Sequence, residues 1–152
     1  MSGVQASVLR VRAEPLTPGA YAPFGEVVAA ARHRLRCAPG QYTARLMPLE
    51  PVPERFVRIN RHVDHEQLFV PLSGGPLLLV VAPKELPGEG FDPRRVRAFV
   101  NDGGFAWTYG VGVWHFAPRA IGGEAAVLNV QGSRYLAHTE VVAMEPAVAV
   151  EL

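Results

Sequence analysis

Two histidines far apart in the sequence are the side chains best suited to carry chemistry. His62 ends the alternating segment 56–62, and His115 follows a glycine-rich stretch. Imidazole titrates near neutral pH, so two such groups around one substrate can move protons between its atoms. Asn60 and Gln67 place neutral amide groups close to His62 in the sequence. We therefore expect His62 and His115 to act as an acid and base pair in a polar site.

The same residue types also suit a divalent metal ion. His62, Gln67 and His115 are the candidate ligands, because imidazole nitrogen and amide oxygen can coordinate Ni, Mn, Zn or Fe. His65 and Glu66 would join them only if the turn after His62 directs them inward. The alternative is a pocket without metal, in which the histidines hydrogen-bond an organic ligand. No organic cofactor is expected, because the sequence has no phosphate-binding or dinucleotide-binding glycine motif.

Strand alternation predicts which side chains accompany His62. In the segment 56–62, Arg58, Asn60 and His62 fall on one face of an extended strand. Arg58 is therefore predicted to bind a substrate carboxylate through its forked guanidinium group. Arg61 points the other way in a regular strand and is the alternative ligand for that carboxylate. A polar face on such an apolar strand indicates a lined cavity.

A second polar stripe occurs late in the chain, in the segment 124–131. Asn129 and Gln131 alternate there with apolar residues, so both are predicted to face the same cavity, with Gln131 as a substrate contact. Tyr109 and Trp114 are aromatic residues of a kind that more often forms the core or the rim of a site. At the rim, Trp114 would contact the substrate.

Length, composition and charge describe the scaffold that must position these residues. The 152 residues, 49% of them hydrophobic, predict one globular domain over 1–152. A net charge of +1 gives no long-range field for nucleic acid or an anionic membrane, so neither is expected as a partner. Cys37 is the only cysteine, it lacks a catalytic signature, and the N-terminus lacks an export signal. The expected location is the cytoplasm, and the expected ligand is a small molecule.

Glycine and proline predict short, frequently turned elements. The 15 glycines and 14 prolines are scattered, which favours about eight to ten short strands in an all-β, mainly antiparallel sandwich or barrel. A helical turn is expected at 17–21, with Thr17 as its N-cap. The apolar run 76–83 predicts a buried strand, and the turn at 73–75 predicts a hairpin that joins it to the strand 67–72.

The two histidine segments resemble the two-part signature of the cupin barrels. Its anchors here are Asn60, His62, Gln67 and Gly74 in the first part, and Gly104, Gly110, Gly112 and His115 in the second. The chain is also similar to the ureidoglycolate lyase family, which are cupin-fold enzymes of allantoin and purine catabolism. The similar segments are 15–18, 22–27, 59–62 with Gln67, Phe69 and Pro71, 97–99, and Tyr109 with Val113-Trp114-His115.

This resemblance implies a fold, an activity and an assembly. The fold would be a cupin-like double-stranded β-helix, or jelly-roll barrel, with short helical turns. The activity would be that of a carbon–nitrogen lyase that releases glyoxylate and urea from ureidoglycolate. The protein would be a cytoplasmic homodimer. Its site would include Arg61, His62, Gln67, Tyr109 and His115, with Tyr109 joining the two histidines as a catalytic residue.

Some positions depart from the family pattern. Phe116 stands where the family commonly has a second histidine, Phe105 where it has a glutamine, and Gln131 where it has an aspartate. Two alternatives therefore stay open. One is a divergent cupin enzyme, an isomerase, lyase or hydrolase, that acts on another small carboxylate. The other is a cupin that binds a small molecule without catalysis.

Overall fold

Two β-sheets supply nearly all of the regular structure in the computed structural model, which describes residues 7–29, 32–36 and 40–152. The first sheet contains β1 (Val8–Pro15), β4 (Phe56–His62), β6 (Leu77–Ala82), β7 (Arg97–Asn101), β9 (Trp114–His115), β10 (Arg119–Ala120) and β12 (Thr139–Glu151). The second contains β2 (Val27–Val28), β3 (Tyr42–Pro48), β5 (Gln67–Gly74), β8 (Ala106–Tyr109) and β11 (Ala125–Gly132). The helical elements are α1 (Pro18–Tyr21) and the 3-10 turn η1 (Pro93–Arg95).

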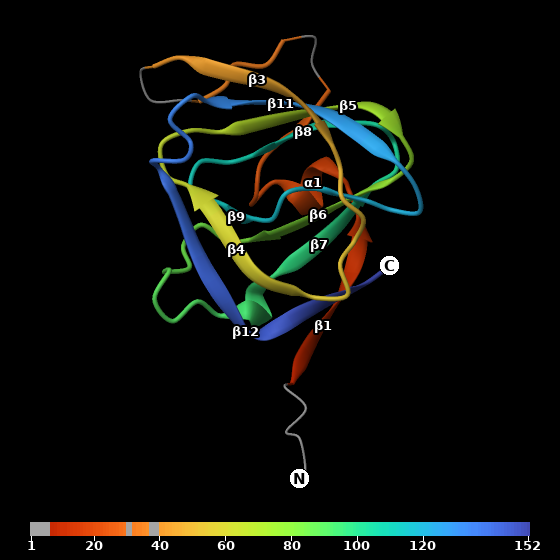
Figure 1. Cartoon of the computed structure of the whole chain (residues 1–152), viewed down its shortest axis with the longest axis vertical. Helices are drawn as coiled ribbons and strands as arrows, with labels where there is room; N and C mark the ends of the chain where they lie inside the picture. Colours follow the sequence, from red (N-terminus) through yellow and green to blue (C-terminus); the bar gives the residue numbers. More distant parts are fainter. Residues whose placement is uncertain (1–6, 30–31, 37–39) are drawn as a thin grey trace.

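The larger sheet curls until it closes on itself. Its order is β10-β6-β7-β1-β12-β4-β9, and β6 also pairs with β9. The smaller sheet has the order β2-β8-β5-β11-β3 and lies across the top of the view in Figure 1. Among the described strands, the parallel ladders are those of β1 with β12 and with β7, and one isolated parallel bridge joins Pro51 to Ala120 of β10. The predicted all-β, mainly antiparallel barrel is therefore confirmed, and it is compatible with a cupin-like barrel.

β6 is buried on both faces because it separates two hydrophobic cores. Leu77, Leu79 and Val81 belong to the core between the two sheets, whereas the alternate residues of β6 point into the closed sheet. This explains the uninterrupted apolar run, since a strand without a solvent face has no reason to alternate. Burial of each such aliphatic side chain stabilises the folded state by roughly 1.5–3 kcal/mol.

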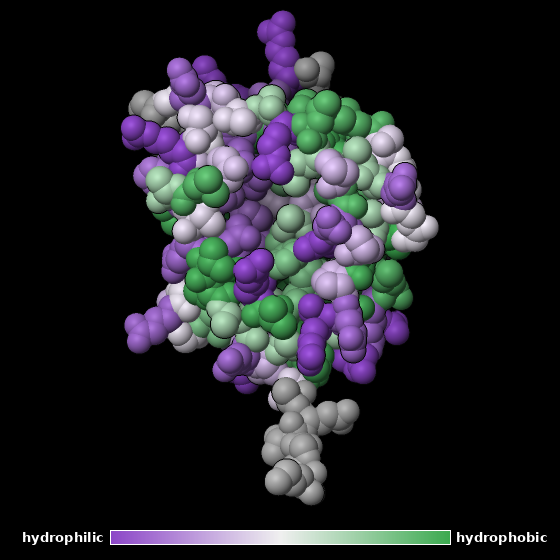
Figure 2. All heavy atoms as spheres, in the orientation of Figure 1, coloured by the Kyte–Doolittle hydropathy of each residue, from purple (hydrophilic) through white to green (hydrophobic). Residues whose placement is uncertain are grey.

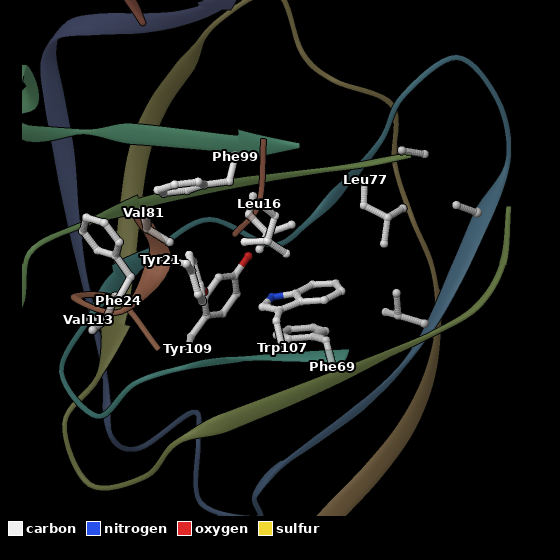
Figure 3. Close-up of a cluster of buried hydrophobic side chains, with 14 residues drawn as sticks. Leu16, Tyr21, Phe24, Phe69, Leu77, Val81, Phe99, Trp107, Tyr109 and Val113 are labelled. Atoms are coloured by element: carbon white, nitrogen blue, oxygen red, sulfur yellow. The ribbon is translucent and has the colours of Figure 1, made fainter. Parts of the chain in front are cut away.

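The core between the sheets is rich in aromatic rings (Figure 3). Trp107 of β8 stacks on Phe69 of β5 with ring centroids 5.1 Å apart. Tyr109 meets the same Phe69 ring edge-on at 5.2 Å. These contacts hold β5 and β8 side by side, where Gln67 and Tyr109 are direct strand partners.

The short helix α1 forms as its sequence predicts. The Thr17 hydroxyl accepts a hydrogen bond from the Ala20 backbone N–H at 3.3 Å, and proline opens the helix. Its buried Tyr21 anchors it between the sheets. In the described parts of the chain, no helix combines the length and apolar character needed to cross a membrane.

The predicted hairpin between β5 and β6 is wrong. The turn at 73–75 does form, but β5 pairs with β8 and β11, whereas β6 pairs with β7, β9 and β10. The chain therefore switches sheets at this turn. Gly74 permits the switch, because its φ is +97° and an added Cβ would collide with the backbone at Glu124 and Ala125.

Candidate active site

A cavity of about 480 Å³ lies between the closed sheet and the smaller sheet. The molecular face in Figure 2 is hollowed near its middle, in the region between β11 and β4 of Figure 1. The lining residues are Arg45, Met47, Arg58, Asn60, His62, Gln67, Phe69, His115, Phe116, Ala117, Arg119, Asn129, Gln131, Tyr135, Leu136, Thr139 and Val141. Both sheets contribute, so residues from distant parts of the sequence meet here.

His115 is fixed in one tautomer by its hydrogen bonds. Its Nδ1 lies 2.9 Å from the Val113 carbonyl, which can only accept, so Nδ1 carries the proton. Nε2 then holds a lone pair, which accepts a hydrogen bond from the Asn60 amide at 3.2 Å. Asn60 and His115 are direct partners across β4 and β9, which accounts for the contact. Tyr109 stacks on the imidazole with centroids 4.4 Å apart.

His62 is fixed in the same way. Its Nδ1 lies 3.0 Å from the Thr139 hydroxyl. That hydroxyl donates its single proton to the Tyr135 carbonyl, so it accepts from His62. Nε2 of His62 is therefore also unprotonated. The two imidazole rings are 5.1 Å apart between centroids.

Both histidines are neutral at pH 7. Burial lowers the pKa of His115 to about 3, and the neighbouring His62 adds to the shift. Burial also lowers the pKa of His62 to about 4, with the adjacent His65 as the next cause. Each imidazole thus offers a lone pair, and neither begins with a proton on Nε2.

Two buried amide oxygens in the cavity lack a partner. Gln67 donates through Nε2 to Asn129 Oδ1 at 3.1 Å, which leaves Gln67 Oε1 without a hydrogen bond. Gln131 Oε1 is likewise buried and unpaired. An unsatisfied buried acceptor costs roughly 1–3 kcal/mol, so both oxygens favour a ligand with N–H or O–H donors. The prediction that Asn129 and Gln131 face the cavity is confirmed.

Three arginines make the cavity electropositive. Arg45, Arg58 and Arg119 line it, and no acidic side chain of the described residues does. The guanidinium of Arg119 lies 4.8 Å above the Phe116 ring, and its Nε is buried without a hydrogen-bond partner. Sequence alternation predicted Arg58 at this site. Arg45 and Arg119 were not predicted to line the cavity. Alternation along the strand 42–48 could have indicated Arg45.

Arg61 and Trp114 do not line the cavity, and their assignment as substrate contacts stays a prediction. Arg61 forms a salt bridge with Glu140 at 2.8 Å and covers the Trp114 ring at 4.3 Å. Trp114 is fully buried and donates from Nε1 to the Leu86 carbonyl at 2.9 Å. Both side chains lie on the opposite face of their strands from His62 and His115, as the period-2 geometry requires.

Tyr109 lies behind His115 rather than in the cavity wall. Its hydroxyl donates to the Phe116 carbonyl at 3.1 Å, and burial raises the pKa of Tyr109. Tyr109 thus supports the His115 imidazole from outside the cavity wall, and its assignment as a catalytic residue stays a prediction. Phe105, one of the departures from the family pattern, is 46% exposed and lies outside the cavity. Phe116 and Gln131 are the departures that line it.

His65 and Glu66 are buried, but neither lines the cavity. Glu66 faces the other way and pairs with His33 Nε2 at 2.6 Å. His65 stacks against His62 at 4.6 Å, with Nδ1 held by Asp64 at 2.8 Å. The turn after His62 therefore does not direct Glu66 toward His62 and His115. Cys37 falls outside the described residues.

A resident divalent metal fits these residues poorly. The Asn60 amide N–H occupies the His115 lone pair that a metal would need. No group of three or more His, Cys, Asp or Glu side chains converges anywhere in residues 7–29, 32–36 and 40–152. The remaining donors are neutral and include no carboxylate, although Gln67 Oε1 is free. The metal assignment of His62, Gln67 and His115 stays a prediction.

The fold and the cavity together define a small β-barrel with a cationic cavity built around two neutral histidines. The profile of the family described as ureidoglycolate lyase matches residues 50–151. A protein named ureidoglycolate lyase from Azotobacter vinelandii (strain DJ) is 34% identical over 123 residues, covering 67% of this chain and 72% of the relative. One from Pseudomonas savastanoi pv. phaseolicola, with the same name, is 28% identical over 165 aligned positions, covering 88% and 94%. The chain belongs to the ureidoglycolate lyase family, as its sequence motifs predicted.

Proposed function

We propose that this protein is a carbon–nitrogen lyase that splits ureidoglycolate into glyoxylate and urea, as part of allantoin and purine catabolism. The observation that carries the proposal is the pair of Nε2-deprotonated imidazoles, His62 and His115, in one cationic cavity. The reaction needs one proton to leave the substrate hydroxyl and one to reach the departing nitrogen. The relatives named ureidoglycolate lyase support the choice of substrate.

Substrate binding follows from the unpaired groups of the cavity. Arg119, with its buried and unpartnered Nε, binds the substrate carboxylate. The oxygens Gln67 Oε1 and Gln131 Oε1 accept hydrogen bonds from the ureido N–H groups. Phe116 keeps the Arg119 guanidinium in place through its ring face. A ureido acid thus satisfies groups that are otherwise buried without partners.

The proton path follows from the protonation state of the histidines. One imidazole Nε2 takes the proton of the substrate hydroxyl while the carbon–oxygen bond becomes a carbonyl and the carbon–nitrogen bond breaks. Because neither Nε2 starts with a proton, the imidazolium formed in this step is the acid that protonates the urea nitrogen. Burial makes that imidazolium a strong acid, which favours the transfer. The atoms balance without any added reagent.

Asn60 and Thr139 act as positioning residues for this path. Asn60 holds the Nε2 side of His115 until substrate arrives, and Thr139 fixes the tautomer of His62. Tyr109 supports His115 from behind by ring stacking. The same roles serve the alternative function, a divergent cupin enzyme acting on another small carboxylate. Phe116 and Gln131, which line the cavity, favour that alternative.

The proposed setting is a cytoplasmic homodimer, as the resemblance to the family implies. Light scattering at micromolar concentration tests the assembly directly. A dimer mass is expected, and a monomer at all concentrations would contradict it.

The decisive variant for the catalytic role is His115→Gln. It should lower kcat for glyoxylate release by roughly 100-fold or more, because proton transfer by a positioned side chain contributes about that much. The matched control is His138→Gln, which removes a partly exposed imidazole outside the cavity and should keep the wild-type rate. Circular dichroism of both variants confirms folding. Full turnover in folded His115→Gln would remove this residue from the mechanism.

A further inference from the structure

The cavity holds more positive charge than the proposed substrate can balance. Ureidoglycolate has one carboxylate, for which Arg119 suffices. Arg45 of β3 and Arg58 of β4 remain, and neither forms an ion pair within the described residues. No acidic side chain from those residues lines the cavity. Two guanidinium groups are therefore left for a second anionic group.

Arg45 and Arg58 lie nearer to the protein surface than Arg119. Arg45 and Arg58 are solvent-exposed residues, whereas the Nε atom of Arg119 is buried. Arg45 reaches the cavity from the smaller sheet, as the strand partner of Asn129. Arg58 reaches it from the closed sheet, two residues before Asn60 on the same face of β4. The two side chains thus approach the mouth from opposite walls, while Arg119 lies further in.

The like charges of the three arginines favour the binding of anions in the cavity. Three like charges around one cavity raise its potential and concentrate anions there, and low-dielectric walls strengthen the effect. A ligand with one carboxylate at Arg119 would leave the outer pair uncompensated. A ligand with a second carboxylate would bridge the inner and the outer cations.

We propose that Arg45 and Arg58 form a second anion subsite at the mouth, so that the cavity prefers small dicarboxylates to monocarboxylates. This inference rests on the proposed function only in placing the first carboxylate at Arg119. It goes beyond that function, because ureidoglycolate carries one carboxylate: it assigns the cavity a preferred class of ligand, small acids with two anionic groups.

Calorimetric titration of the whole protein tests the subsite without relying on turnover. The probes are malonate, succinate and glutarate, compared with acetate, propionate and butyrate. The best dicarboxylate should bind about tenfold more tightly than the best monocarboxylate, since two exposed cations each add a modest charge-assisted contact. Raising the salt concentration should shrink this preference. Equal affinities for the two classes, or no binding of either, would overturn the proposal.

Variants assign the preference to its residues. The double variant Arg45→Gln, Arg58→Gln should reduce dicarboxylate affinity to the monocarboxylate level and leave monocarboxylate binding within about twofold. Arg119→Gln should weaken both classes. The charge-matched control is Arg12→Gln, an exposed β1 residue outside the cavity, which should change neither. A double variant that keeps the dicarboxylate preference refutes the subsite.

Turnover separates this proposal from the proposed function. A dicarboxylate preference without glyoxylate release would refute the lyase activity and retain the subsite. Glyoxylate release with equal affinities for both ligand classes would retain the lyase and refute the subsite.

Discussion

Replacing His115 by glutamine should make the protein less sensitive to acid. The folded protein holds the pKa of His115 at about 3 through burial, whereas an unfolded chain returns it to roughly 6.5. Between these values the unfolded state binds the extra proton. The free energy of unfolding therefore falls as pH drops below about 6.5, and the glutamine variant lacks this contribution.

The magnitude follows from the width of that window. Between pH 7 and pH 5, about 1.5 pH units lie below the unfolded pKa, and each is worth roughly 1.4 kcal/mol. His115 alone should thus lower the free energy of unfolding of the wild-type protein by about 2 kcal/mol between pH 7 and pH 5. Other titrating groups are present in both proteins and cancel in the difference.

Urea unfolding at pH 7 and pH 5 measures this difference. From pH 7 to pH 5, the free energy of unfolding of the wild-type protein should fall by about 2 kcal/mol more than that of His115→Gln. Equal m values would show that both proteins expose similar surface on unfolding. Losses that agree within about 0.5 kcal/mol would refute the assignment of His115 as a buried, neutral imidazole.

Three further predictions concern the rate, a positioning residue and the sheet switch. The kcat/KM for glyoxylate release should stay level from pH 8 to about 5 and fall near pH 4, where His62 titrates; a fall near pH 6.5 would contradict its burial. Thr139→Val should lower kcat by roughly tenfold or more while Thr139→Ser restores it, because only the hydroxyl fixes the His62 tautomer; equal rates in the two variants would contradict this role. Gly74→Ala should lower the free energy of unfolding by about 2 kcal/mol or more, whereas Gly75→Ala, whose added Cβ would meet only the Ile121 carbonyl oxygen at 3.9 Å, should change it by less than about 0.5 kcal/mol; similar losses would count against the strain at Gly74.

Local periodicity predicted the part of the site that lies on regular strands. Arg58, Asn60 and His62 share the cavity face because β4 alternates regularly from Arg58 to His62. The same rule placed Asn129 and Gln131 correctly on β11. Such predictions succeed because side-chain direction in a strand depends only on neighbouring backbone geometry.

Features set by distant contacts were not predictable in this way. Arg119 lies on a two-residue strand whose place beside β6 follows from pairing across about 40 residues, which a local pattern does not encode. The hairpin prediction at 73–75 failed for a related reason. A glycine turn signals a change of direction, but the partner of β6 is decided by burial on both of its faces.

The resemblance to the family located the site but not the direction of every side chain. Arg61 matches a family motif, yet it lies over Trp114 and pairs with Glu140. Phe116 replaces an expected histidine and supports Arg119 through its ring. A motif match thus fixes the strand position, whereas the contacts of this chain decide what each residue touches.

Direct turnover of ureidoglycolate is the measurement that tests the central claim. Folded wild-type protein should release glyoxylate and urea in equal amounts, at the same rate with and without added divalent metal, and His115→Gln should not. No release from folded protein under either condition would contradict the lyase assignment. Release that requires added metal would contradict the proton path through His62 and His115.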